Sequence, residues 1–133
     1  MSIELSNLNH ALNSRINGMV PAGIYRAEIV RATVETSKSD NPQIVYNLEI
    51  ESGSHAGAIV MKFTQLTEGT IDYVIDDMHL FKISIRDMND LPAILESLVG
   101  TLVDIEVSYR EGYKYPVPRF VRMICRADRT YID

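Results

Sequence analysis

The sequence predicts a mainly β protein, a small antiparallel barrel with helix inserted between its third and fourth strands. Runs of alternating apolar and polar residues predict three strands between residues 23 and 66 and two more between 101 and 126. Between these groups, residues 70–99 carry apolar side chains at the three- and four-residue spacing of amphipathic helices. These two observations fix the expected element order as three strands, helix and two strands.

The first strand is expected over residues 23–36 and contains a change of phase. Its apolar positions first fall on one face and then move by one residue, which is what a β-bulge produces and which bends a strand. The two sets are Tyr25, Ala27 and Ile29, followed by Val30, Ala32 and Val34.

The second and third strands are expected over residues 43–51 and 58–66. In the second, alternate residues from Ile44 to Ile50 should face the core. In the third, the larger apolar set should face inward and the set containing Lys62 outward; that inward set is Ile59, Met61 and Phe63. The connecting segments SKSDNP (37–42) and SGSHAG (52–57) are rich in turn-forming residues.

Residues 70–99 should form helix in two parts. Thr70 is the expected N-cap of the first part, whose apolar stripe runs to Phe81 and Lys82. Asp90 is the expected cap of the second part, and Gly100 ends it.

The last two strands are expected over residues 101–110 and 118–126, joined by the segment REGYKYPVPR. Residues 1–22 are expected to form a separate arm or short helix with the apolar stripe Leu5, Leu8, Leu12 and Ile16, and residues 23–133 are expected to form the single domain. The element order is that of the OB-fold, a five-stranded barrel. Another half-open β-barrel, or an α+β sandwich with both helices on one sheet face, fits the same pattern.

Composition excludes several classes of protein. No apolar run approaches the roughly 20 residues of a membrane-spanning helix, and the polar N-terminus does not resemble a signal peptide. The single cysteine, Cys125, excludes an internal disulfide and suits a reducing cytoplasm. Phosphate-binding loops, nucleophile elbows and metal-ligand spacings are missing from the sequence. We therefore expect neither an enzyme nor a bound cofactor or metal.

The net charge of −5 is unevenly distributed. Residues 67–106 carry two basic and nine acidic side chains, a balance of −7, whereas residues 107–133 carry six basic and three acidic ones, a balance of +3. Charges farther apart than about 10 Å are largely screened near 0.1 M salt. A basic surface at the strands can therefore act independently of an acidic helical flank.

Basic and aromatic residues gather in two loops and on the strands between them. Single-stranded nucleic acid is bound by cations that follow the phosphates and by aromatic faces on which bases stack. In OB-folds, the loops between strands one and two and between strands four and five flank the binding surface. The candidate residues are Arg26, Arg31, Lys38, Lys62, Arg110, Tyr113, Lys114, Tyr115, Arg119 and Arg122.

The sequence also resembles a family of small acidic bacteriophage proteins, the OB-fold single-stranded DNA-binding proteins of replication and recombination modules. The resemblance rests on PAGIYRAEIV, TSKSDNPQIVYNLEI, SGSHAG and DLPAILESLVGTLVDIEV. It implies that Lys38 and Asn41 lie in a DNA-facing turn, opposite Tyr113 and Lys114. Many single-stranded DNA-binding proteins carry a long acidic C-terminal tail, whereas this chain ends in ADRTYID.

These observations lead to two functional hypotheses. The first is a cytoplasmic protein that binds single-stranded DNA without sequence preference and without catalysis. The alternative is a protein–protein adaptor or structural phage protein that uses its strands and acidic helices. The apolar stripe of residues 1–22 favours a homodimer in either case.

Overall fold

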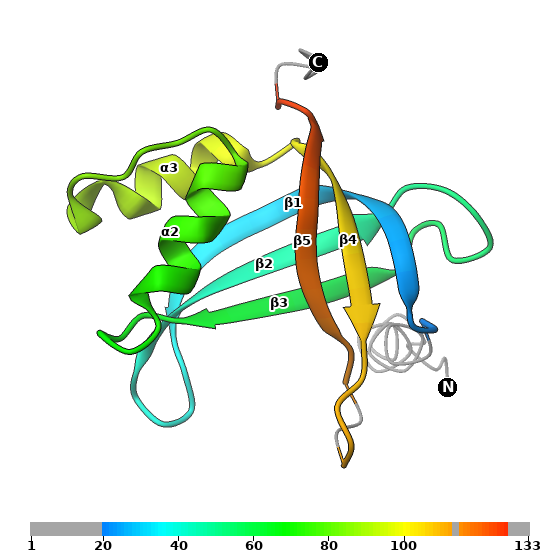
Figure 1. The fold of residues 1–133 in the computed structure, drawn as a ribbon, viewed down its shortest axis with the longest axis horizontal. Helices are drawn as coiled ribbons and strands as arrows, with labels where there is room; N and C mark the ends of the chain where they lie inside the picture. The colour runs from blue at the N-terminus through cyan, green and yellow to red at the C-terminus, as the bar shows by residue number, and fades with distance from the viewer. Residues whose placement is uncertain (1–19, 113–114, 128–133) are drawn as a thin grey trace, which may run out of the picture.

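The structure is a computed structural model that describes residues 20–112 and 115–127. Its elements follow the predicted order, and every strand boundary lies within two residues of the prediction (Figure 1). They are β1 (Gly23–Thr36), β2 (Pro42–Ile50), β3 (Ile59–Gln65), α2 (Ile71–Leu80), the 3₁₀ helix η2 (Met88–Asp90), α3 (Leu91–Leu98), β4 (Leu102–Ser108) and β5 (Val117–Cys125).

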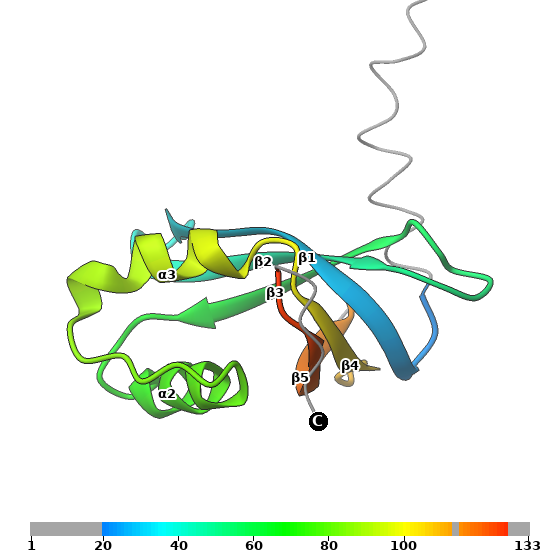
Figure 2. The same cartoon turned by 90° about the horizontal axis from the view of Figure 1, so that it is seen from above.

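The five strands form one curved antiparallel sheet in the order β3-β2-β1-β4-β5 (Figures 1 and 2). The long central strand β1 pairs with β4 over residues 23–28 and with β2 over residues 27–36. The predicted pairing of the first and fourth strands is therefore confirmed. The outermost strands β3 and β5 approach each other without a hydrogen-bonded ladder, so the sheet is not closed between them.

A bulge bends β1 where the phase change predicted it. The register with β2 shifts between Ile29 and Arg31, which leaves Val30 as the extra residue. Ala27 and Ile29 before the bulge and Ala32 after it are all buried in the core. Val34, which was also expected inside, lies near the C-terminal end of β1 and is 39% exposed.

The predicted inner face is confirmed for β2 and wrong for β3. Alternate residues of β2 from Ile44 to Ile50 are buried. In β3 the inward residues are Val60, Lys62 and Thr64, while Met61 and Phe63 lie on the outer face. The cause is the register of the β2–β3 hairpin: Ile50 bonds with Gly57 and Ala58, which sets Lys62 opposite the buried Tyr46.

Two helices complete the core, as Figure 2 shows from above. Helix α2 buries Val74 and Met78, and Phe81 follows it onto the ring of Phe120 in β5, with ring centroids 5.1 Å apart. The first helix ends at Leu80, earlier than predicted, and Lys82 follows in a left-handed conformation (φ 63°). Helix α3 runs beside the part of β1 that β4 leaves unpaired, which covers an otherwise open sheet edge.

The predicted N-cap residues stand at the expected positions, but their side chains do not make the expected capping hydrogen bonds. Thr70 and Asp90 precede α2 and α3 as expected, but neither side chain caps its helix. The Thr70 hydroxyl instead donates to the carbonyl of Gln65 (2.5 Å), which ties the helix start to the end of β3. Asp87 provides a cap one turn earlier, where its carboxylate accepts from the amide of Asn89 (2.9 Å).

The predicted N-terminal stripe from Leu5 to Ile16, and the homodimer expected from it, lie outside the described residues. Within the described part of the chain, no helix is long and apolar enough to cross a membrane.

Candidate nucleic-acid interface

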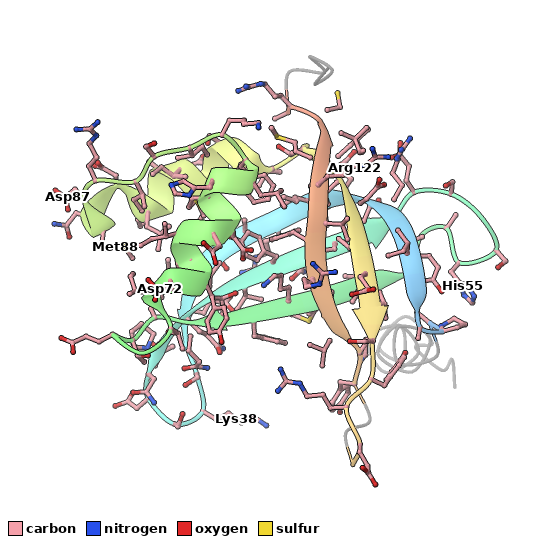
Figure 3. The ribbon with its side chains drawn as sticks, viewed as in Figure 1. Lys38, His55, Asp72, Asp87, Met88 and Arg122 are labelled. Carbon is pink, nitrogen blue, oxygen red and sulfur yellow. The ribbon has the colours of Figure 1, made fainter. Side chains whose placement is uncertain are left out.

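The β1–β2 loop presents one cation to solvent. Ser37 and Asn41 close the loop, since the Ser37 amide donates to the Asn41 carbonyl (2.8 Å) and the Asn41 amide donates to the Ser37 hydroxyl (3.2 Å). The Asn41 side chain also lies 3.4 Å from the Ser39 hydroxyl, so it shapes the loop from within. Lys38 is exposed, forms no ion pair with any described residue, and lies on the loop outside the sheet (Figure 3). Lys38 is therefore available to an anion.

The connection between β4 and β5 supplies a second cation and an aromatic ring. Arg110 is exposed and forms no ion pair with the described residues, and the ring of Tyr115 is also exposed. Tyr113 and Lys114, the other two candidates here, lie outside the described residues. In the view of Figure 1, this connection and the β1–β2 loop both extend beyond β3 on the same side.

Two of the predicted arginines share one buried carboxylate on the outer face of β1, β4 and β5. Arg26 Nε lies 3.3 Å from Asp104 Oδ1, and Arg122 Nε lies 2.7 Å from Asp104 Oδ2. The Arg26 side chain is 45% exposed and the Arg122 side chain 67% exposed, and Figure 3 shows Arg122 on β5. Asp104 therefore holds two cations side by side and neutralises one of them.

Arg119 and Arg31 are also paired. Arg119 contacts Glu106 at 2.9 Å across β4 and β5, and Arg31 contacts Glu35 at 3.1 Å along β1. Exposed pairs of this kind contribute only about 0–1 kcal/mol of stability. Each arginine can therefore exchange its carboxylate for a phosphate at little cost to the fold.

Lys62 is not a surface residue, and the prediction that it faces outward is wrong. Its Nζ lies 3.3 Å from Asp77 Oδ2 of α2 and 3.3 Å from the Thr64 hydroxyl, and it sits 5.3 Å from the centroid of the Phe120 ring. Burial raises the pKa of Asp77, and the charge and hydrogen bond of Lys62 partly offset this rise. Lys62 of β3 therefore contacts both α2, through Asp77, and β5, through Phe120, on the inner side of the sheet.

The outer face of β3 carries two large side chains that the sequence did not assign to a site. Phe63 is 55% exposed and Met61 is 41% exposed. Phe63 lies in one cross-strand row with Val45 and Thr33, and the next row contains Met61, Asn47 and Arg31. An exposed ring on a rigid strand is a surface on which a base can stack.

The register of the β2–β3 hairpin could have indicated which face of β3 is exposed. Alternation alone does not tell which face of a strand is buried, and β3 has apolar residues on both. Reading Ile50 opposite Ala58 across the SGSHAG turn would have placed Phe63 opposite Val45 and outside the core.

We use the name β3 face for a set of candidate residues: Phe63 and Met61 on the strand, Arg31 two strands away, and the exposed Lys38, Arg110 and Tyr115 of the two loops. The described residues include no group of three or more histidine, cysteine or carboxylate side chains that could hold a metal ion. In comparisons with known proteins, no protein-family model and no curated protein matched the chain. The interpretation of the β3 face therefore rests on its own chemistry.

Proposed function

We propose that this chain is an OB-fold protein that binds single-stranded DNA without strong sequence preference. The element order and the strand order β3-β2-β1-β4-β5, with β3 beside β5, support this fold. The resemblance to bacteriophage single-stranded DNA-binding proteins supports a role in phage replication or recombination. We propose no chemistry on the DNA, since the β3 face contains cations, aromatic rings and a thioether rather than a nucleophile with a paired base.

The observation that carries the proposal is the exposure of Phe63 and Met61 on β3, in a molecule whose β1–β2 loop and β4–β5 connection also present exposed cations. Burying an exposed ring against a base removes apolar surface of both partners from water, and each stack contributes about 1–3 kcal/mol. Stacking accepts any base, so this arrangement favours binding without sequence preference.

The cations of the β3 face differ in how freely they can reach phosphate. Lys38 and Arg110 form no ion pair with a described residue, whereas Arg31 must leave Glu35. Arg26, Arg119 and Arg122 lie on the outer face of β1, β4 and β5. They belong to the proposed site only if the bound DNA extends from the β3 face onto that face. Lys62 is excluded from it by its position inside.

The first prediction concerns salt and strandedness. A fluorescently labelled oligodeoxynucleotide titrated with the protein should lose affinity with rising salt. If about four phosphates are neutralised at roughly 0.7 ions each, the slope of log affinity against log salt is about −3. Duplex DNA of the same length should bind more weakly, because its bases are already stacked on one another and cannot reach Phe63.

Two results of this titration would contradict the proposal. Binding that does not depend on salt would rule out contacts to the phosphates. Equal affinity for duplex and single-stranded DNA would rule out stacking of bases on Phe63.

A further inference from the structure

A second surface lies where β1 ends and where α2 and α3 begin. Here the end of β1, the β3–α2 connection and the start of α3 enclose a groove of about 550 Å³. This volume lies within the range of about 300–1,000 Å³ typical of ligand sites. We call it the end groove; its lining is Val34, Leu66, Thr67, Glu68, Ile71, Met88, Asn89, Leu91 and Pro92.

The end groove is apolar at its base and partly open. Leu91 is buried in the core, while Val34 is 39% exposed and Met88 is 41% exposed. Methionine is flexible and adapts to differently shaped partners. Covering these two side chains would remove apolar surface from water, which favours an apolar occupant.

Carboxylates lie at this groove and beside its lining residues. Glu68 lines the groove, Asp72 follows the lining residue Ile71, and Asp87 and Asp90 flank Met88 and Asn89. None of these four forms an ion pair with a described residue. Figure 3 shows Asp72, Asp87 and Met88 at the same end of the molecule.

We propose that the end groove binds a basic amphipathic segment of a partner protein. Apolar side chains of that segment would cover Val34 and Met88, and its lysines or arginines would pair with these carboxylates. Acidic groups lie on both the β3–α2 side and the η2 side of the groove, so a segment longer than the groove can reach both.

Charge distinguishes this occupant from two others. Single-stranded DNA carries the same sign of charge as the groove and is repelled. Residues 1–19 of a second copy carry one acidic and one basic side chain, Glu4 and Arg15, and so offer no net positive charge. The proposal does not depend on DNA binding at the β3 face, because the two surfaces share no residue.

The test uses two labelled peptides of equal length, one a leucine–lysine amphipathic helix and the other its leucine–glutamate counterpart. Fluorescence anisotropy should show saturable binding of the lysine peptide and at least tenfold weaker binding of the glutamate peptide. Glu68→Lys should weaken the lysine peptide severalfold, while Glu51→Lys should not. Glu51 is also exposed and lies in the β2–β3 connection, so both variants change the net charge equally.

Three outcomes would overturn the proposal: equal binding of both peptides, equal effects of the two variants, or tighter binding of a peptide of residues 1–18 than of the lysine peptide. The methyl resonance of Met88 should shift on saturation, and a shift confined to other methyl groups would also overturn it. Oligonucleotide affinity should be unchanged in Glu68→Lys. If the lysine peptide does not bind while the oligonucleotide affinity is intact, the proposal for the end groove is rejected and the proposal of DNA binding is not.

Discussion

Lys62→Ala should reduce the free energy of unfolding by about 3 kcal/mol near pH 8. Removing one partner of a buried ion pair typically costs about 3–5 kcal/mol, because the remaining charge is left without compensation. The Lys62 and Asp77 side chains are 15% and 18% exposed, so we expect the lower end of that range. The variant also loses the contact between Lys62 of β3 and the Phe120 ring of β5. Urea unfolding followed by circular dichroism measures the loss.

The same variant should be less affected in acid. The pKa of Asp77 is raised in the folded protein, mainly by burial, so the folded state binds a proton more tightly than the unfolded state. Stability therefore falls as pH rises from the ordinary carboxyl pKa of about 4 through the raised value. Without Lys62 the pKa rises further, so the loss should be smaller near pH 4 than near pH 8.

A double variant provides the control. Lys62→Met with Asp77→Leu replaces both charges with apolar groups, and such replacements are often neutral or stabilising. This variant should be clearly more stable than Lys62→Ala near pH 8. A loss below about 1 kcal/mol in Lys62→Ala, with no dependence on pH, would mean that the pair behaves like an exposed one.

Phe63→Ala should weaken the binding of a labelled oligodeoxythymidylate by about five- to 150-fold. This range corresponds to about 1–3 kcal/mol for the loss of one base stack. The fold should change little, because the Phe63 ring lies on the outer face and is 55% exposed. Titrations of the wild-type and variant proteins at the same salt concentration measure the effect, and circular dichroism confirms that the variant is folded.

Tyr73→Ala is the matched control for Phe63→Ala. Tyr73 is an equally prominent exposed ring, 65% exposed, but it lies on helix α2 beside the acidic residues Asp72 and Asp76. Its replacement should leave oligonucleotide affinity unchanged. Equal losses in the two variants would assign the effect to general surface changes rather than to stacking on β3.

Local features of the fold followed from the sequence. The bulge at Val30 was predicted from a one-residue change of phase, which is a property of the strand itself. The helix starts at Ile71 and Leu91 were marked by Thr70 and Asp90. The early end of α2 was missed because Lys82 has a left-handed backbone, which the apolar spacing does not reveal.

The composition of the candidate site was less predictable, since it depends on partners distant in the chain. Arg26 meets Asp104 across 78 residues, and this pairing requires the β1–β4 register. Lys62 was assigned to the surface because lysine is rarely buried without a partner, and its partner Asp77 lies on another element. The same inverted assignment of the two faces of β3 placed Phe63 in the core, so it was not considered as a site residue.

Photocross-linking tests the central claim most directly. An oligodeoxynucleotide containing a photoreactive halogenated uracil is bound to the wild-type protein, irradiated, and the linked peptides are identified by mass spectrometry. Binding at the β3 face predicts cross-links at Phe63 and at Tyr115 in the β4–β5 connection. Both should disappear when an excess of single-stranded DNA without the halogenated uracil is added. Cross-links confined to α2 or the end groove, or none at saturating protein, would contradict a single-stranded DNA site on this face.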